Sequence, residues 1–594
     1  MAAPTSVREE TPQRPPSRFT GLITHPRVFL PAAGLLVAFV LVTAAFPKET
    51  GDFLAKVNDS VVEDLGWWYI AAVTSFVFFA VWLAASRLGD IVLGKDDDEP
   101  EFGLGSWFAM LFAAGMGIGL VFWGVAEPLS HFASPPPGSP AGTPALNART
   151  AMDTTFLHWG LHAWAIYVVV GVSIAYSVHR RGNPVSIRWA IEPLLGHRVH
   201  GFWGDVIDVT AVLGTLFGVA TSLGLGVSQI SAGLAYLGVV DEPTTFLLIA
   251  LIVVITSIAL VSVVTGVDKG IRYLSNINMG VAVALMLAVV LLGPTFFIFS
   301  DFVTQVGSYI QRFFEMSFNA RPFQEDGKAW LGDWTTFYWG WWMSWAPFVG
   351  VFIARISRGR TVREFVVGVL AVPTLVTFLW FSVMGGTALY EQIFGAGGLV
   401  AEDGSVSTDT ALFQMFDLLP GSAFLSGVAL LLIVVFFVTS SDSGSFVVDM
   451  LASGGNQNPP VWSRAFWAAM EGAVAGVLLY VGIQAQETDP SVNPLGALQT
   501  MAILLALPFS LVMVAMCIAT AREMLAEIRV IRREERRLLA QQLTDHVARE
   551  VRRGSAVPSR PSRPSWTRGS WRAGRSGSNG SEPSDDADGV SGDR

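Results

Sequence analysis

The chain has 594 residues, of which 52% are hydrophobic and only 14% are charged, and its formal net charge is −10. Soluble globular domains carry about 25% charged residues, so this composition excludes an ordinary soluble enzyme of the same length. The single Cys517 cannot pair within the chain, which also excludes a disulfide-built secreted protein.

Twelve mostly apolar runs follow a polar, Pro-rich leader at 1–27, and each is long enough for the roughly 20 residues that cross a bilayer. The first run has no small-residue cleavage site and does not read as a signal peptide. The runs lack the short alternating strands of a membrane β-barrel. We therefore predict an all-α integral membrane protein with twelve transmembrane helices, near 28–46, 67–93, 105–128, 154–178, 204–238, 243–264, 274–300, 335–356, 365–390, 422–445, 464–483 and 496–520.

The third span contains three glycines at every second position, Gly115, Gly117 and Gly119. Each weakens a helix by roughly 1 kcal/mol, so the span is a candidate for a break whose free carbonyls could bind a cation. Small residues at this spacing also permit close helix packing, and the motif alone leaves both alternatives open. Pro347 and Gly350 mark a second candidate break, in the eighth span.

Two aromatic groups lie deep within spans, although Trp and Tyr usually gather at the membrane interfaces. They consist of Trp159, Trp164 and Tyr167 in the fourth span and Trp339, Trp341, Trp342 and Trp345 in the eighth. A quaternary ammonium held over indole faces gains about 0.5–2 kcal/mol per contact. For any one Trp, helix packing or lipid contact is the more frequent role. The two groups together, with few charged residues near them, favour a cation site.

The tenth span ends in hydroxyl-bearing residues, Thr439 and Ser440, followed by Asp442. Hydroxyl and carbonyl oxygens suit a small alkali cation, whereas Ser and Thr in helices often bond only to the preceding turn. Asp442 either caps the helix, pairs with an Arg or takes part in the ion site.

Ionisable residues within predicted spans are functional candidates, and we consider three of them here. His158 and His162 are one turn apart and could relay protons, although hydrogen-bonded structural histidines are more frequent. Glu471 has no partner that the sequence identifies.

Lys and Arg residues are concentrated in one set of loops, at 179–181, 269–272 and 355–360, and in the leader. The loops at 391–420 and 484–495 contain neither residue type. The positive-inside rule then predicts that both termini lie in the cytoplasm. The membrane itself is predicted to be the plasma membrane.

Three segments outside the spans have distinct expected roles. Segment 301–334 is predicted to be an extracellular connection with a surface-lying helix. Segment 521–553 is predicted to be a basic cytoplasmic helix, which either contacts anionic membrane lipids or only sets the topology. Segment 554–594 is rich in Ser, Pro, Gly and Arg and is predicted to be disordered.

The chain contains no Walker-type phosphate loop, no His-Glu-x-x-His and no Gly-x-Ser-x-Gly. We therefore predict that it is not an enzyme, that it holds no organic cofactor and that it has no nucleic-acid partner. A membrane-embedded enzyme acting on lipid headgroups would need a nucleophile–base pair or a metal cluster at depth, and the sequence suggests neither.

Three segments together resemble the betaine/carnitine/choline transporter family. They are Ala-Gly-Met-Gly-Ile-Gly at 114–119, the Trp-rich segment that begins at 339 and runs on to the arginines ending at 360, and Thr-Ser-Ser-Asp-Ser at 439–443. The resemblance covers roughly residues 28–520.

The resemblance implies a LeuT-like fold, in which two leading helices at 28–93 precede two inverted five-helix repeats. The first repeat would occupy 105–300, with spans three to seven, and the second 335–520, with spans eight to twelve. It also implies a homotrimer, since the family is usually trimeric.

Site residues carried over from the family fall into four sets. The substrate site would comprise Trp159, Trp164, Tyr167, Trp341, Trp342, Trp345, Met116, Gly117 and Gly119. Phe337 and Trp339 would line the outer pathway. A sodium site between the third and tenth spans would comprise Ala113, Met116, Phe436, Thr439 and Ser440. A second ion site would use Thr215 with Phe348, but Val219 stands where a second hydroxyl is expected.

Together these features predict a secondary symporter that imports a quaternary-ammonium compatible solute with sodium, with osmotic regulation through the basic helix. Proton-coupled choline carriers of the family tend to carry an acid where Gly119 stands, so a zwitterion such as glycine betaine is favoured over choline; ectoine and proline stay open. The alternatives are a proton-coupled choline transporter and, in another class, a membrane osmosensor or receptor without transport.

Overall fold

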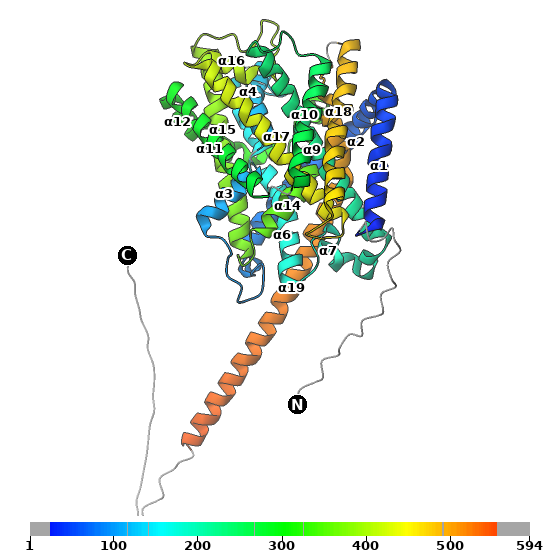
Figure 1. The fold of residues 1–594 in the computed structure, drawn as a ribbon. Helices are drawn as coiled ribbons and strands as arrows, with labels where there is room; N and C mark the ends of the chain where they lie inside the picture. The colour runs from blue at the N-terminus through cyan, green and yellow to red at the C-terminus, as the bar shows by residue number, and fades with distance from the viewer. Residues whose placement is uncertain are drawn as a thin grey trace, which may run out of the picture. The chain divides into compact units, whose positions relative to one another are not determined.

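The structure is a computed structural model that describes residues 24–115, 117–140, 142–265, 268–324, 326–489 and 492–554. Throughout these residues the regular elements are helices, which confirms the all-α prediction. Residues up to Arg529 form one compact unit of long helices (Figure 1), and the described residues from Val530 onward belong to a second unit.

Each of the twelve predicted runs coincides with a long helix or with an interrupted pair. The helices are α1 Pro26–Ala45, α2 Pro47–Ala85, α3 Leu104–Gly115, α4 Ile118–Ala133, α5 Pro144–Trp159, α6 Leu161–Ala175, α9 Phe202–Tyr236, α10 Thr245–Thr265, α11 Asp268–Leu292, α14 Phe337–Arg355, α15 Val362–Phe394, α17 Ser422–Ala452, α18 Val461–Thr488 and α19 Gly496–Gly554. Ten candidate spans within the described residues are long and apolar enough to cross a membrane. The interrupted pair α3–α4 and the Trp-rich α14 are not among them, so the number twelve stays a prediction.

The connections contain shorter helices and one longer amphipathic helix. They are α7 Ile187–Ala190, α8 Glu192–Leu195, α12 Thr295–Ser317, α13 Gly327–Leu331 and α16 Ala411–Asp417. Several predicted boundaries were wrong. The second span begins at Pro47, and the seventh ends at Leu292. The second span ends at Ala85, because residues 87–90 form a separate short turn. The helix expected within 301–334 begins at Thr295, directly after Pro294.

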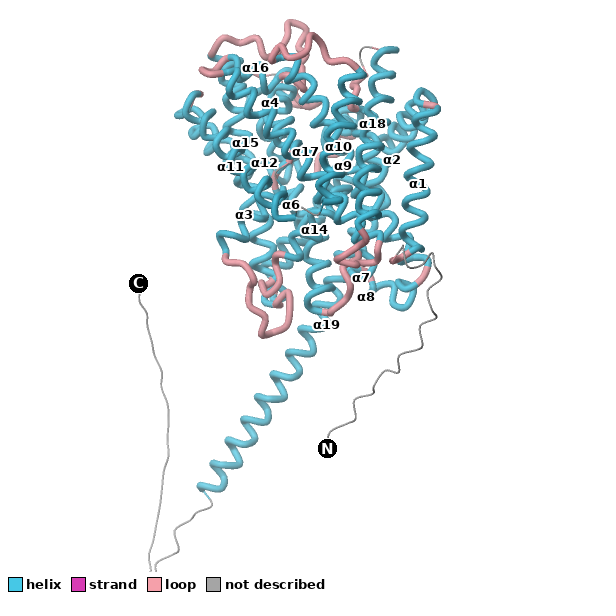
Figure 2. The backbone as a smooth tube through the Cα atoms, in the orientation of Figure 1, coloured by secondary structure: helices cyan, strands magenta, loops and turns pink. Residues whose placement is uncertain are grey.

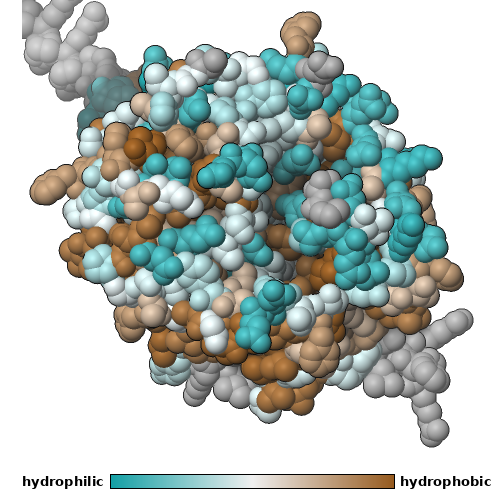
Figure 3. All heavy atoms as spheres, turned by 90° about the horizontal axis from the view of Figure 1, so that it is seen from above, coloured by the Kyte–Doolittle hydropathy of each residue, from teal (hydrophilic) through white to brown (hydrophobic). Residues whose placement is uncertain are grey.

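Connecting loops gather at the two ends of the helical unit (Figure 2). The end with α7 and α8 carries charge pairs such as Arg180 with Glu527 and Arg358 with Asp98. Hydrogen bonds from the Arg358 guanidinium hold the pKa of Asp98 below its usual value. The opposite end, where α16 lies, presents hydrophilic side chains over much of its face (Figure 3). Polar ends on an apolar bundle are the arrangement that a bilayer requires.

The two predicted five-span halves contact each other in matched pairs. The eighth span, α14, packs against the fourth, α6, and the third span, α4, packs in the same way against the ninth, α15. The fifth span, α9, packs against α17 and α18, and the sixth, α10, packs against the same two helices. This exchange of partners is the packing expected of two related five-helix repeats.

Two spans are interrupted at glycine. α3 ends at Gly115 and α4 begins at Ile118, with Gly117 in an extended conformation, so of the two alternatives for the third span the structure shows the break. A second interruption, at Gly160 between α5 and α6, was not predicted. The candidate break at Pro347 is not observed, because α14 continues through this residue to Arg355. Neighbouring helices can satisfy the backbone groups that a proline frees within a membrane helix.

Close packing of α14 on α19 depends on a missing side chain at Gly340. A Cβ there would lie 3.0 Å from the Ile503 Cα and 3.4 Å from the Ala502 carbonyl oxygen. The Ser344 hydroxyl donates to that same Ala502 carbonyl, at 3.0 Å. The two helices therefore meet backbone to backbone at this level.

Replacing Gly340 with Ala should destabilise the helical unit by about 1–3 kcal/mol, because overpacking against rigid backbone forces the helices apart. The thermal midpoint of the purified protein in detergent is the measurement. Gly427→Ala on α17 is the matched control, since a Cβ at Gly427 meets nothing within 4 Å. Equal midpoints for the two variants would contradict the packing described.

Candidate functional site

Aromatic rings from α5 and α14 meet in the middle of the helical unit. The Trp159 ring lies 4.8 Å from Trp342 and 6.3 Å from Trp341, centroid to centroid, at interplanar angles of 68° and 83°. Phe381 of α15 lies 5.2 Å from Trp159 on another side. The structure thus brings three of the predicted substrate-site residues together as faces and edges of one buried cluster, which we call the indole cluster (Trp159, Trp341 and Trp342).

Backbone carbonyls accept from the two indole N–H groups of α14, and one of these carbonyls lies beside a helix break. The Trp342 Nε1 donates to the His158 carbonyl at 3.0 Å. This carbonyl lies two residues before the interruption at Gly160, where the regular ladder of the helix stops. The Trp341 Nε1 donates to the Gly218 carbonyl of α9 at 3.3 Å. Both rings are therefore oriented by hydrogen bonds and not by packing alone.

The glycines of the third span lie directly against these rings. A Cβ at Gly119 would be 2.5 Å from Trp341 and 3.2 Å from Trp159, and one at Gly117 would be 3.7 Å from Trp345. Glycine at 119 is thus required by the rings in this conformation. The break in the third span and the indole cluster form one site.

The other predicted aromatic residues occupy different positions. Trp164 and Tyr167 are buried on α6 and pack against each other, at 5.4 Å. Trp345 packs against Phe348, at 5.3 Å, and its Nε1 has no hydrogen-bond partner among the described residues. The structure therefore does not gather all six aromatic residues into one box.

The two residues assigned to the outer pathway lie on different faces of α14. Phe337 stacks on Trp341 at 5.6 Å, beside the indole cluster. Trp339 is fully buried and stacks on His162 of α6, at 5.1 Å. Trp339 could therefore line a pathway only in another conformation of the protein.

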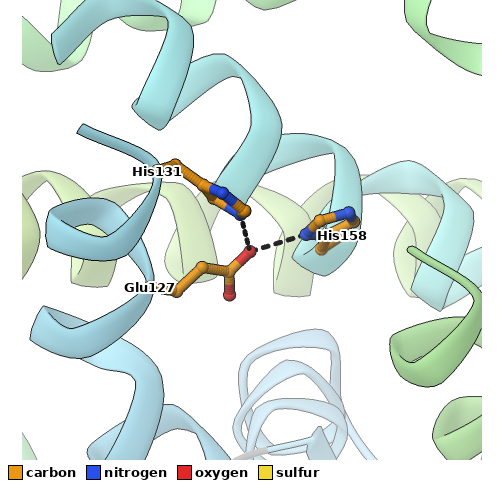
Figure 4. Close-up of side chains that lie close together, drawn as sticks. All are labelled: Glu127, His131 and His158. Atoms are coloured by element: carbon orange, nitrogen blue, oxygen red, sulfur yellow. Dashed lines mark hydrogen bonds and ion pairs between the residues drawn. The ribbon is translucent and has the colours of Figure 1, made fainter. Parts of the chain in front are cut away.

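A buried carboxylate, Glu127, adjoins the cluster and was missed by the sequence interpretation. Figure 4 shows it with its two histidine neighbours, His131 and His158. Glu127 of α4 accepts a hydrogen bond from the Trp159 Nε1 at 2.6 Å and contacts the His158 Nδ1 at 2.6 Å. The His131 Nε2 lies 3.5 Å from the same carboxylate, and the His158 Nε2 contacts the Thr335 hydroxyl at 2.9 Å. The expectation that few acids accompany the aromatic residues was therefore wrong. The position of Glu127 within a predicted span was the sequence feature that could have identified it as a functional candidate.

Glu127, His131 and His158 also form a group that could hold a metal ion, with one ligand atom from each within 4.8 Å of the others. Two ligands of a tetrahedral zinc ion, each about 2.0–2.2 Å from the metal, lie about 3.4 Å apart. The 2.6 Å contact between His158 and Glu127 is instead a hydrogen-bond distance. The group is arranged as a hydrogen-bond network that orients Trp159.

The predicted sodium ligands are described in part. Met116 and the side chain of Ala113 lie outside the described residues. On α17, the Thr439 hydroxyl donates to the Val435 carbonyl at 2.9 Å and is 3.3 Å from the Phe436 carbonyl, while Ser440 is half-buried. α17 packs against α4, so the tenth span adjoins the interrupted third span.

The residues of the second predicted ion site are placed as follows. The Thr215 hydroxyl of α9 donates to the Ala211 carbonyl one turn back, at 2.7 Å. Phe348 of α14 is half-buried and lines a large cavity. The ion site itself stays a prediction.

That cavity, of about 530 Å³, reaches from the end with the basic loops toward the indole cluster. Its lining includes Arg355, Asn458, Asp442 and Arg464. Phe348 also lines it, and the Phe348 ring packs against Trp345. On the opposite side of the cluster, Trp334 packs against His131 at 4.3 Å and against Trp123 at 5.6 Å. The cavity thus lies toward the end with the basic loops, and packed rings lie on the other side of the cluster.

Residues 27–529 match the family model described as betaine/carnitine/choline family transporter. The chain belongs to this transporter family. It is 51% identical over 502 residues to an uncharacterized transporter of Mycobacterium tuberculosis, covering 84% of this chain and 82% of that protein.

Two further relatives bear a substrate name. The chain is 44% identical over 507 residues to a glycine betaine transporter of Bacillus subtilis, covering 84% of this chain and 96% of that protein. It is also 44% identical over 511 residues to glycine betaine transporter 1 of Vibrio parahaemolyticus, covering 85% and 95%. The predicted family is therefore confirmed, and the chain is a multi-pass membrane protein of a transporter family.

Removing the Glu127 carboxylate should destabilise the protein by about 2–5 kcal/mol, because Glu127→Ala leaves the Trp159 N–H and His158 without their buried partner. Thermal unfolding in detergent measures the change. Glu315→Ala, which removes an exposed acid from α12, is the control and should leave the midpoint within about 0.5 kcal/mol of wild type. If Glu127→Ala were as stable as the control, the network would not orient the ring.

Proposed function

We propose that the protein is a secondary active symporter that imports a quaternary-ammonium compatible solute, glycine betaine above all, together with sodium. The observation that carries this proposal is the indole cluster against the interrupted third span. Electron-rich faces attract a methylated ammonium that has no hydrogen to donate. The relatives named as glycine betaine transporters support the same substrate class.

A zwitterion fits the site better than a simple cation because of Trp345. Its buried indole N–H has no acceptor among the described residues, although it lies beside Gly117 and one ring away from the open cavity. Buried donors are usually satisfied, and a substrate carboxylate would satisfy this one. The ammonium would then lie over Trp341 and Trp342, and the carboxylate toward Trp345.

Glu127 favours the second candidate, a proton-coupled choline transporter. Its carboxylate lies one hydrogen bond from Trp159, so the cluster has an acid beside it even though residue 119 is glycine. A full cation would be attracted by that charge. Uptake of labelled betaine and choline into vesicles, with sodium and proton gradients imposed separately, distinguishes the two, and saturable accumulation excludes a sensor without transport.

Coupling to sodium would use Thr439 and Ser440 with the broken third span, so that the ion orders the segment around Gly117 before the substrate binds. With the basic loops in the cytoplasm, the open cavity faces inward, and the two repeats would then rock to open the covered side. We also propose that the chain forms a homotrimer in the plasma membrane. The basic segment after 521 would contact anionic lipid and make transport responsive to osmotic stress.

Trp345→Phe keeps a ring but removes the N–H, so it should raise the half-saturation constant for betaine by about 10- to 100-fold, the value of a hydrogen bond to a charged group. The constant for choline, which has no carboxylate, should change less. Radiolabelled uptake into vesicles measures both. Trp67→Phe, at a site 56% exposed, is the control. A variant with unchanged betaine kinetics would count against the pose.

Thr439→Ala should raise the sodium concentration for half-maximal uptake by roughly 5-fold or more, because it removes one hydroxyl ligand from the ion. The maximal rate at saturating sodium should change little. Thr265→Ala on α10 is the matched control, since both hydroxyls bond to the carbonyl one turn back, at 2.9 Å and 2.7 Å. Uptake that ignores sodium in the wild-type protein would end the sodium proposal.

A further inference from the structure

Glu471, in the middle of α18, is a buried acid with an incomplete set of partners. Its side chain is fully buried. The Ser441 hydroxyl of α17 donates to its Oε2 at 3.0 Å, while its Oε1 has no hydrogen-bond partner among the described residues. A Cβ at Gly444 would lie 3.1 Å from that Oε1 and 3.0 Å from Val219, so the free oxygen points into the contact of α18 with α17 and α9.

No basic side chain neutralises Glu471 in the described part of the chain. Arg464 lies two turns earlier on α18, about 10 Å along the helix axis, and is paired with Asp442 at 3.6 Å. α10, which packs against α18, contains no ionisable residue, and the charged residues of α2 all precede Gly66.

The other ionisable groups of the packed helices are remote or engaged. Asp442 is the one that faces Glu471 from α17, directly after Ser441, and it is an acid. Tyr69 of α2 donates to the Ile503 carbonyl, and Asp208 of α9 is paired with Arg188. Arg27 begins α1, and Tyr480 lies more than two turns later on α18.

An ionised carboxylate in these surroundings would be both unpaired and short of donors. Buried acids in this situation bind a proton, because the neutral form loses far less hydration free energy than the ionised form when it leaves water. A sodium ion at the same place would need several oxygen ligands, whereas the recorded partner is a single hydroxyl. The contacts therefore favour a proton over a metal ion.

We propose that Glu471 is a proton-binding site in the membrane interior, and that its proton and the sodium ion of the proposed symport oppose each other. Ser441, its hydroxyl partner, directly follows Thr439 and Ser440 on α17. A cation held by those residues stabilises the ionised carboxylate, and a proton on the carboxylate removes that attraction. This coupling rests on the proposed sodium site; the protonation of Glu471 does not.

The coupling predicts that sodium binds more tightly as the pH rises and Glu471 loses its proton. In proteoliposomes of the full chain, the sodium concentration for half-maximal betaine uptake should fall about five-fold between about pH 6 and about pH 8. E471Q, which mimics the protonated acid, should show no such change. D449N is the control and should keep it, because Asp449 is a carboxylate of α17 held by the Ser463 and Ser453 hydroxyls. A pH dependence that persists in E471Q, or is absent in wild type, overturns the coupling.

Infrared spectroscopy tests the protonation without sodium or transport. The wild-type protein should show the carbonyl stretch of a protonated carboxylic acid, which E471Q removes, E471D shifts and D449N retains. A spectrum unchanged in E471Q overturns the proton site. If uptake proves indifferent to sodium while this band behaves as expected, the proposed sodium symport fails and the proton site stands.

Discussion

Lipid offers no acceptors to buried indole N–H groups, and the three rings of the indole cluster find theirs within the protein. A continuous helix uses nearly all of its carbonyls internally. The His158 carbonyl, beside the interruption at Gly160, accepts a hydrogen bond from the Trp342 indole. The Glu127 carboxylate accepts one from the Trp159 indole. The aromatic residues can therefore be held at fixed angles deep in the bundle because the helices around them are broken or carry an acid.

The same constraint links the site to movement. Gly117 and Gly119 touch the rings of Trp345, Trp341 and Trp159, so any change in the interrupted segment changes the space between those rings. A cavity lined by Phe348 lies toward one end, and packed rings of Trp123, Trp334 and His131 lie toward the other. Glu127 connects those rings to the indole cluster through His158 and Trp159.

Local features of the sequence predicted the helices and the break at Gly117, because apolar length and glycine spacing act within one segment. The break at Gly160 was missed because a single glycine in an apolar run has no local signature. A Cβ there would lie 2.4 Å from the Phe156 carbonyl oxygen and 2.8 Å from Phe378, contacts that only the fold creates. Trp164 and Tyr167 were grouped with the other aromatic residues by their depth in one predicted span and by the family resemblance, but that span is interrupted between Trp159 and Trp164. The partners of Glu127 come from two helices, and only the fold brings them together.

Two buried acids show how the surroundings of a carboxylate decide its role. Glu127 has an indole donor, one histidine at 2.6 Å and a second at 3.5 Å, so its charge is shared over a network and its position is rigid. Glu471 has one hydroxyl and a free oxygen among the described residues. A well-partnered carboxylate holds other groups in place, whereas a poorly partnered one responds most to the arrival of a cation. For that reason Glu471 beside α17, and not Glu127 beside the rings, is the group whose charge is expected to change.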